Sequence, residues 1–362
     1  MSTAEFPQTE TGGNRPWPVR LLYSLGDLPG AVWPVGAILL VIPTFVSDFM
    51  MFQVFGWAFV LGLIALSLMF LAGYGGMVSL VQMTVAAFAG YMVAIFGTSG
   101  VQEISMGLPW YITIPIAIIL ATLFCVIAGA LAVRTEGIYT IMITLAIASA
   151  FFYFTRQNYT IFNGFSGFNG VLPPEIFGVN WRDPMAYYYL ALFWAVLGFA
   201  AVSYVSRSPF GLVLQGIRDN PRRMAALGYN VNAHRIAAYA FSGVMAAVGG
   251  ILLTWSNGQI SPGTAAVGPV IDILVIAVIG GVSRPIGPFI GALIYVLLRT
   301  FALDILVSLG LGGERFKLLI GVGFLVIVFW SSDGIVGLWE RYRDRWKQRK
   351  DPLTGDRQEG SS

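Results

Sequence analysis

The sequence predicts an all-α integral membrane protein with about ten transmembrane helices. Its 362 residues are 57% hydrophobic and 11% charged, whereas a typical soluble domain has about 25% charged residues. Apolar runs of about 18 or more residues recur along the chain, and each is long enough to cross about 30 Å of hydrocarbon as a helix. The sequence lacks the short alternating segments of a transmembrane barrel.

Ten spans are expected, and their number places both termini on one side of the membrane. The side that carries Arg134, Arg284 and the basic segment 207–235 is assigned to the cytoplasm by the positive-inside rule. Arg182 and the group at 314–317 depart from this distribution. The approximate spans are 31–47, 51–72, 77–97, 109–132, 137–157, 185–206, 235–256, 268–282, 286–306 and 316–332.

The regions outside the spans have distinct compositions. Residues 1–30 are polar and are expected to form a disordered cytoplasmic tail, and residues 333–362 form a second cytoplasmic tail of mixed charge. Between them, residues 31–332 form the transmembrane domain. Three glycines within four positions, Gly73, Gly75 and Gly76, predict a broken helix or a tight cytoplasmic turn. Some helices are therefore expected to be broken or re-entrant.

Several classes of chemistry are excluded by the scarcity of reactive side chains. One His and one Cys cannot assemble a His/Cys metal site or a Cys–His nucleophilic pair, so no metal and no cofactor is expected. No aromatic residues interleave with the basic ones, so nucleic acid is not a predicted partner, whereas membrane lipids are. Asp272 is the acidic residue well inside a span, and burial of its charge favours a gating or helix-pairing role.

The inner segment 207–234 contains two short predicted helices. Asn220 suits the N-cap of the second helix, Pro221 its first position, and Gly228 the left-handed residue that ends it. An apolar ridge bordered by arginines is expected on this helix. Two roles fit such a helix: docking in a groove of a partner protein, or lying on anionic lipid headgroups.

One pattern runs through this segment: Phe210, Gly211, Arg218, Asp219, Asn220, Ala225, Ala226, Leu227 and Gly228. It resembles the coupling loop of ABC importer permeases, and more narrowly that of the branched-chain amino acid importer group. The resemblance extends over roughly residues 55–340 and includes five further motifs in the family's order. These motifs are Gly73-Tyr74-Gly75-Gly76, Arg134-Thr135-Glu136-Gly137-Ile138-Tyr139, Asn169-Gly170, Ile260-Ser261-Pro262 and Asp333-Gly334-Ile335-Val336-Gly337.

The resemblance implies a permease subunit of an ATP-driven importer in the inner membrane. Its expected partners are a second permease subunit that is a paralogue, two ATP-binding subunits and an external solute-binding protein. The nine residues of the coupling pattern are then expected to act on an ATPase subunit. The chain has no G-x-x-x-x-G-K-[ST] motif, so it is not expected to be an enzyme itself.

The expected cargo is a branched-chain or other hydrophobic amino acid. Met77 and Gln82 depart from the residues usual in the family, so urea or short amides stay open as an alternative cargo. An ion-coupled secondary transporter is the alternative from another class. The residues expected to line or gate the pathway are Ser79, Gln82, Thr144, Asn169 and Asp272.

Overall fold

The structure is a computed structural model, and it describes residues 39–308 except 136, 176, 177 and 179, together with residue 321. The chain divides into two units, Met1–Phe45 and Val46–Ser362. In the first unit, the described residues include one 3-10 turn, Ile42–Thr44. The predicted site residues all lie in the second unit. The predicted tails 1–30 and 333–362 lie outside the described residues.

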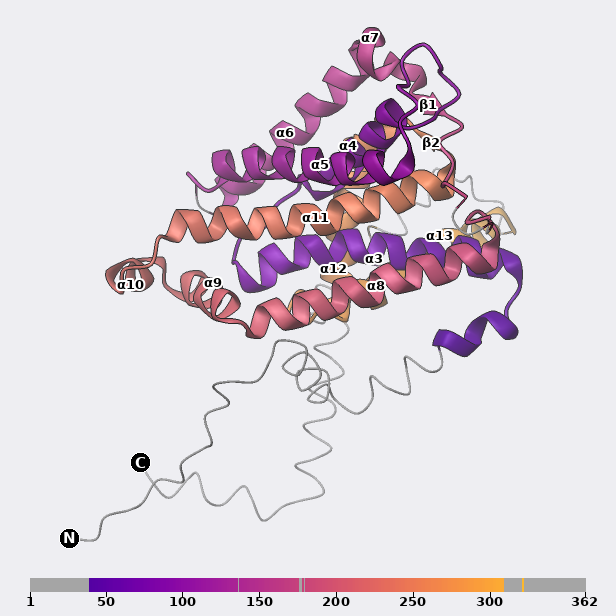
Figure 1. The fold of residues 1–362 in the computed structure, drawn as a ribbon. Helices are drawn as coiled ribbons and strands as arrows, with labels where there is room; N and C mark the ends of the chain where they lie inside the picture. The colour runs from indigo at the N-terminus through magenta and orange to yellow at the C-terminus, as the bar shows by residue number, and fades with distance from the viewer. Residues whose placement is uncertain (1–38, 136, 176–177, 179, 309–320, 322–362) are drawn as a thin grey trace, which may run out of the picture. The chain divides into compact units, whose positions relative to one another are not determined.

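The second unit is a bundle of helices that run back and forth along one direction (Figure 1). Its first helix, Met50–Tyr74, consists of α3 (Trp57–Met69) with a π-helical segment at each end. The other long helices are α4 (Gln82–Phe96), α5 (Trp110–Ala132), α6 (Ile138–Gln157), α8 (Pro184–Arg207), α11 (Val231–Asn257), α12 (Val267–Gly280) and α13 (Gly287–Ser308). The short elements are α7 (Tyr159–Phe162), α9 (Pro209–Asp219), α10 (Pro221–Ala226), β1 (Phe168–Asn169), β2 (Gln259–Ile260) and the 3-10 turns Gly164–Ser166 and Pro262–Ala265.

Eight of the ten predicted spans coincide with helices of this bundle. Five of the described helices are long and apolar enough to cross a membrane: Met50–Tyr74, α5, α6, α8 and α11. The predicted span 316–332 and most of 31–47 lie outside the described residues. The prediction for 77–97 was wrong at its start, because residues 77–81 are not helical and α4 begins at Gln82. The 15 residues of α4 extend for about 22 Å.

Proline-directed caps begin three of the helices. Asp183-Pro184 begins α8, Ser208-Pro209 begins α9, and Asn220-Pro221 begins α10. Proline suits the first helical position because the amide hydrogen that it lacks would have no partner within the helix. The predicted cap at Asn220 is confirmed, since its side chain accepts a hydrogen bond from Arg223 N at 3.0 Å.

The centre of the bundle is formed by α3 and α11. Most residues of both helices are buried, whereas most residues of α5, α6 and α8 are not. Helices approach closely at small residues spaced four apart, such as Ala246 and Gly250 of α11 or Gly287 and Gly291 of α13. A Cβ added at Gly250 of α11 would collide with the Ala86 carbonyl of α4, and one added at Gly291 of α13 would collide with the Ile276 carbonyl of α12. Small residues allow this close contact between helix backbones.

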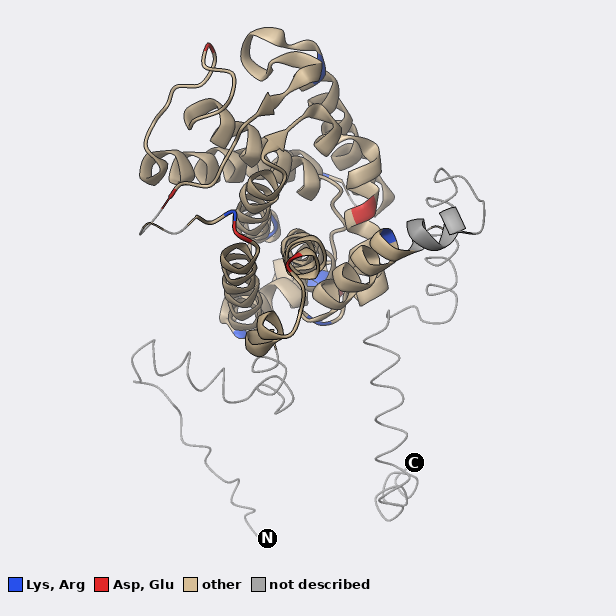
Figure 2. Cartoon of the chain, turned by 90° about the vertical axis from the view of Figure 1, so that its right-hand side faces the viewer, with Lys and Arg blue, Asp and Glu red and all other residues tan. Residues whose placement is uncertain are grey.

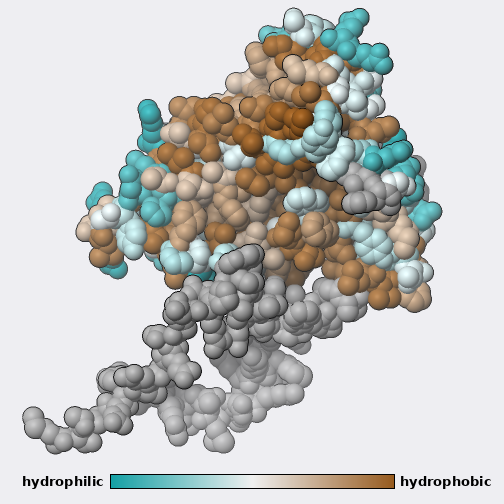
Figure 3. Space-filling view, in the orientation of Figure 1, coloured by the Kyte–Doolittle hydropathy of each residue, from teal (hydrophilic) through white to brown (hydrophobic). Residues whose placement is uncertain are grey.

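The two ends of the bundle differ in what they carry. At one end, which we call the α9–α10 end, the chain turns at residues 73–81, 133–137, 208–230 and 281–286 (Figure 1). At the other, the β1–β2 end, β1 and β2 pair antiparallel, with Phe168 opposite Ile260 and Asn169 opposite Gln259. Figure 2 looks at the bundle from the β1–β2 end, and charged residues take up little of the ribbon. In Figure 3, apolar side chains cover the middle of the visible face and hydrophilic ones gather toward its ends.

Candidate functional site: the α9–α10 end and the segment 77–82

The helix α9 packs one face against the bundle. Its buried residues Gly211, Leu214 and Ile217 are spaced three apart, so they lie on one side of the helix. Ser208 caps this helix by accepting a hydrogen bond from Gly211 N at 3.3 Å. A Cβ at Gly211 would collide with the Val205 carbonyl, so glycine lets the chain turn back closely at the end of α8. These contacts fix α9 to the end of α8.

The helix α10, in contrast, projects from the bundle. None of its residues is buried, and it lies at the far edge of the molecule in Figure 1. Ala225 and Ala226 are exposed, and Leu227 is 67% exposed. The chain leaves this helix at Gly228, whose φ of +90° confirms the predicted left-handed residue. The predicted coupling residues thus include an exposed apolar surface at Ala225, Ala226 and Leu227.

Arg218, near the end of α9, makes contacts with another part of the bundle, unlike the exposed residues of α10. The Arg218 side chain is 42% exposed, and its Nη1 donates a hydrogen bond to the Gly73 carbonyl at 2.5 Å. Its Nε and Nη2 each lie 3.0 Å from Asp219 Oδ1. Arg218 therefore connects α9 to the turn that follows α3, whereas Asp219 is 68% exposed.

Three of the predicted pathway residues come together at the non-helical segment 77–81 and the start of α4. Ser79 and Thr144 are fully buried. Thr144 of α6 accepts a hydrogen bond from Leu80 N at 3.1 Å, and its hydroxyl donates within α6 to Thr140 O at 3.0 Å. Thr144 therefore provides a hydrogen-bond acceptor for the Leu80 amide, which lies outside any helix. This hydrogen bond fixes the segment to α6.

Gln82 is buried in the interior, where both ends of its amide have partners. Its Oε1 accepts a hydrogen bond from Ser67 of α3 at 3.1 Å, and its Nε2 donates to Ser242 of α11 at 3.4 Å. Ser242 also donates to a carbonyl within its own helix, whereas the single hydroxyl proton of Ser67 is shared between Gln82 and a carbonyl of α3. Gln82 thus links α4 to the two central helices, and its amide is already satisfied within this chain.

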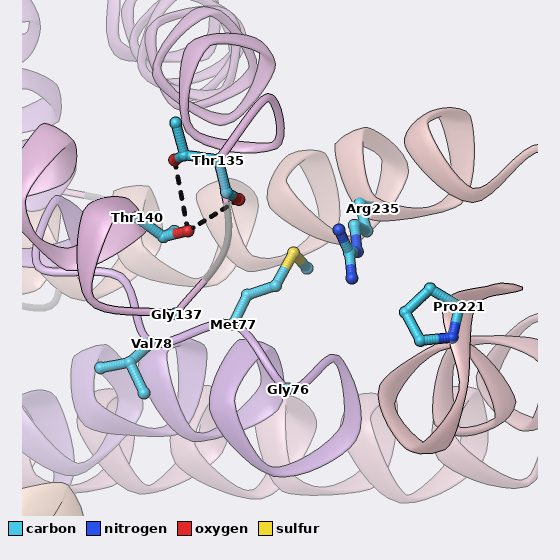
Figure 4. Close-up of a pocket in the computed structure, with 8 residues that line it drawn as sticks. All are labelled: Gly76, Met77, Val78, Thr135, Gly137, Thr140, Pro221 and Arg235. Carbon is cyan, nitrogen blue, oxygen red and sulfur yellow. Dashed lines mark hydrogen bonds between the residues drawn. The ribbon is translucent and has the colours of Figure 1, made fainter.

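A pocket of about 180 Å³ opens beside this segment. Figure 4 shows Met77 extending into it, with Arg235 and Pro221 on one side and the Thr135–Thr140 pair on the other. Thr140 donates to the Thr135 carbonyl at 3.0 Å. The residues that line the pocket are Gly76, Met77, Val78, Thr135, Gly137, Thr140, Pro221 and Arg235. The pocket thus lies between the segment 77–82, the α5–α6 turn and the start of α10.

The other two predicted pathway residues lie away from this cluster. Asn169 belongs to β1 at the opposite end, where it is exposed and its carbonyl accepts a hydrogen bond from Gly100 N at 2.7 Å. Asp272 of α12 is half-buried and accepts a hydrogen bond from Tyr295 of α13. The five predicted residues therefore do not form one site, although Asp272 does connect two helices.

His234, to which the sequence assigned no role, has a structural one. Its ring stacks on Phe210 of α9 with centroids 5.9 Å apart and planes inclined by 14°. Tyr229 meets the same ring edge-on at 5.8 Å. The histidine thereby joins α9 to α11. A histidine in the first turn of a helix carries no sequence signal that distinguishes this contact from an exposed position.

Comparison with known proteins gives the family. The family described as the permease component of branched-chain amino acid transport systems matches residues 50–328. The chain belongs to this family. Among its relatives, the high-affinity branched-chain amino acid transport permease LivM of Escherichia coli is 22% identical over 75% of this chain and 65% of its own length. A probable branched-chain amino acid permease LivM of Methanocaldococcus jannaschii is 25% identical over 61% of this chain and 67% of its own length.

A ribose import permease, RbsC of Haemophilus influenzae, is 24% identical over 57% of this chain and 64% of its own length. The chain thus spans about two thirds of these relatives, and 65% of the Escherichia coli protein. No solved structure matches the chain. Its family and its apolar helices make it a multi-pass membrane protein.

The geometry of this permease offers contact surfaces more readily than reactive groups. Among the described residues, no three His, Cys, Asp or Glu side chains gather in a way that could hold a metal ion. The cysteine is fully buried between helices. What the α9–α10 end presents is a projecting helix, a small pocket and a segment without regular structure held by hydrogen bonds.

Proposed function

We propose that this permease is a membrane subunit of an ATP-driven ABC importer for branched-chain or other hydrophobic amino acids. The observation that carries the proposal is the exposed α10 at the end of a bundle that belongs to this permease family. Leu227 and the neighbouring alanines suit docking into a groove, because they offer apolar contact area on a capped helix. The sequence has no phosphate-binding loop, so ATP would be hydrolysed by separate ATP-binding subunits.

The proposed orientation places the α9–α10 end in the cytoplasm. The exposed basic residues Arg222 and Arg223 lie on α10, and Arg134 follows α5 at the same end. The positive-inside rule favours the cytoplasm for this end. Glu103 and Glu175 belong to the loops of the β1–β2 end, which would face an external solute-binding protein. The inner membrane and a paralogous second permease complete the proposed importer.

The proposed pathway would run past the segment 77–82. Ser79, Gln82 and Thr144 would act here mainly by holding the segment in place, since the hydrogen bonds of Gln82 and Thr144 are made within the chain. Asn169 would act at the outer entrance, and Asp272 would pair α12 with α13 as a gate. Amino acid cargo is supported by the similarity to the two LivM permeases of branched-chain amino acid transport, which align with 75% and 61% of this chain.

The test is a competition uptake assay on the importer reconstituted in vesicles with its ATP-binding subunits and binding protein. Leucine, urea and a short amide are each supplied in labelled form, and an unlabelled aromatic amino acid is added as a competitor of leucine. We expect leucine to enter in an ATP-dependent manner and the aromatic amino acid to compete. Entry of urea or the amide without leucine would refute the proposed cargo, and uptake without ATP would refute the importer.

A further inference from the structure

Residues 73–76, which are the last two residues of the helix Met50–Tyr74 and the turn after it, are here called the turn. They contact two other parts of the α9–α10 end. On one side, a Cβ added at Gly73 would collide with the carbonyl oxygen of Val282, between α12 and α13. On the other side, a Cβ added at Gly76 would lie 2.7 Å from Cγ and 3.5 Å from Cα of Arg218. The backbone of the turn is therefore in direct contact with the last residues of α9.

Arg218 holds the turn by a hydrogen bond as well as by this packing. The carbonyl of Gly73, which receives the hydrogen bond from its guanidinium, is among the last in the helix Met50–Tyr74. Carbonyls in the last turn of a helix lack partners within the helix, and a cation is favoured there by the helix dipole. Asp219 fixes the direction of the guanidinium through two contacts of 3.0 Å. Arg218 is thus attached to the C-terminal end of the first helix.

The turn continues directly into the segment 77–82, which is attached to other helices. Leu80 is bonded to α6 through Thr144, and Gln82 is bonded to α3 and α11. Met77 and Val78 line the pocket beside α10. A displacement of α9 would therefore move the turn first, and then the segment whose hydrogen bonds reach the centre of the bundle.

We infer that Arg218 is a positioning residue that transmits movement of α9 and α10 to the segment 77–82. The family resemblance assigns Arg218 to the contact with an ATPase subunit, whereas its observed contacts are made within this chain. In this proposal, the exposed residues of α10 make the contact with the ATPase subunit. This inference rests on the proposed function, because only a permease driven through α10 has such a movement to transmit.

A double-mutant cycle on the purified chain in detergent tests the contact without any partner. The variants are Gly76→Ala, Arg218→Ala and their combination. The matched control is Gly107→Ala, because Gly107 has a φ of +65° against +67° for Gly76 and no atom within 4 Å of an added Cβ. Both alanine variants introduce the same backbone strain. They differ because only Gly76→Ala also places a Cβ against Arg218.

We expect Gly76→Ala to lower the melting temperature by several degrees more than Gly107→Ala. Adding Arg218→Ala should recover part of the loss at Gly76, because the colliding Cγ is removed, and should recover nothing at Gly107. Equal shifts for the two glycine variants, or simple additivity in both pairs, would refute the contact.

Cysteine labelling of the assembled importer tests transmission. Val78→Cys introduces a thiol beside the pocket, while Cys125 is fully buried. With a membrane-impermeant maleimide in inside-out vesicles, we expect ATP to change the labelling rate of Cys at this position. Arg218→Met retains most of the stem over Gly76 but loses the charged donor, so it should reduce the ATP effect by about tenfold. Arg218→Lys should restore part of it, because a donor to Gly73 is present again.

Retention of the ATP-binding subunits separates the two possible roles. Arg218→Met should co-purify with them as the unaltered chain does, whereas Leu227→Asp on α10 should lose them. Loss of the subunits from Arg218→Met, an unchanged ATP response, or no ATP response in the Val78→Cys chain itself would each refute transmission. If the unaltered chain never binds ATP-binding subunits, the proposed function fails as well, while the double-mutant cycle still reports on the contact.

Discussion

Gln82 connects three helices through a single side-chain amide. Ser67 of α3 and Ser242 of α11 are its partners. Neither hydroxyl depends on Gln82 alone, because Ser242 donates to a carbonyl of α11 and Ser67 shares its proton between Gln82 and a carbonyl of α3. Interhelical hydrogen bonds between membrane helices contribute about 0.6 kcal/mol on average. The role of Gln82 is therefore to fix the start of α4 between α3 and α11, with a modest effect on stability.

We predict that Gln82→Leu lowers the free energy of unfolding of the detergent-purified chain by about 1 kcal/mol, since two interhelical hydrogen bonds are lost. Thermal unfolding measures the change. Gln157→Leu, at an exposed position near the end of α6, is the control and should have little effect. If uptake by the Gln82→Leu importer shows a changed cargo preference with unchanged stability, the residue contacts cargo and does not hold the helix.

We predict that Gly228→Val leaves the bundle folded and impairs uptake. Its φ of +90° is unfavourable for a β-branched residue, although no neighbouring atom lies within 4 Å of an added Cβ. The strain should alter the end of α10 by about 1–2 kcal/mol. Gly268→Val is the control, because its surroundings are equally open and its φ is not positive. Equal uptake by both variants would show that the shape of this turn does not matter.

At the scale of elements, α12 and α13 form a pair joined by close packing and by polar contacts. Asp272 accepts a hydrogen bond from Tyr295 of α13, and Tyr295 in turn lies near Arg299 of the same helix. The Arg299 guanidinium also lies over the ring of Trp57 of α3, 5.3 Å from its centroid. The polar contacts thus extend from α12 through α13 to the start of α3, which supports the expected helix-pairing role of Asp272.

We predict that Asp272→Leu lowers the free energy of unfolding by about 1–3 kcal/mol, because the buried Tyr295 hydroxyl loses its acceptor. Asp272→Asn should cost less, since the amide oxygen still accepts the hydrogen bond. Melting temperatures and uptake rates of the two variants give the comparison. Glu103→Leu, at an exposed carboxylate in the loop between α4 and α5, is the control. Wild-type stability and uptake of Asp272→Leu would mean that the pairing is unimportant.

At the scale of the whole molecule, the two ends of the bundle differ: one has a projecting helix and the other has paired strands. The α9–α10 end carries a projecting helix and exposed arginines, while β1 and β2 join the loops at the opposite end. The central helices α3 and α11 are mostly buried, whereas α5, α6 and α8 have large exposed apolar surfaces. These surfaces suit lipid or a second permease subunit.

We predict that Ala225→Cys is labelled only from the cytoplasmic side and Glu103→Cys only from the outside. Both positions are exposed, and they lie at opposite ends of the bundle. A membrane-impermeant maleimide applied to intact and then permeabilised cells that produce this chain without ATP-binding subunits measures the difference. The unaltered chain, whose one cysteine is buried, is the control and should stay unlabelled. The reverse pattern would invert the proposed topology, and labelling of both positions from one side would contradict a membrane-spanning bundle.

The sequence by itself determined the helical bundle and the local structure of the α9–α10 segment. Apolar runs, the cap at Asn220 and the left-handed Gly228 depend on residues close together in the chain, so their physical causes are readable there. The tertiary structure alone decided which residues act together. The partners of Arg218 and Gln82 lie 145 and 160 positions away along the chain, at Gly73 and Ser242. Only the packing of the helices brings such residues together, because in an apolar bundle the direction that each polar side chain faces depends on its neighbours.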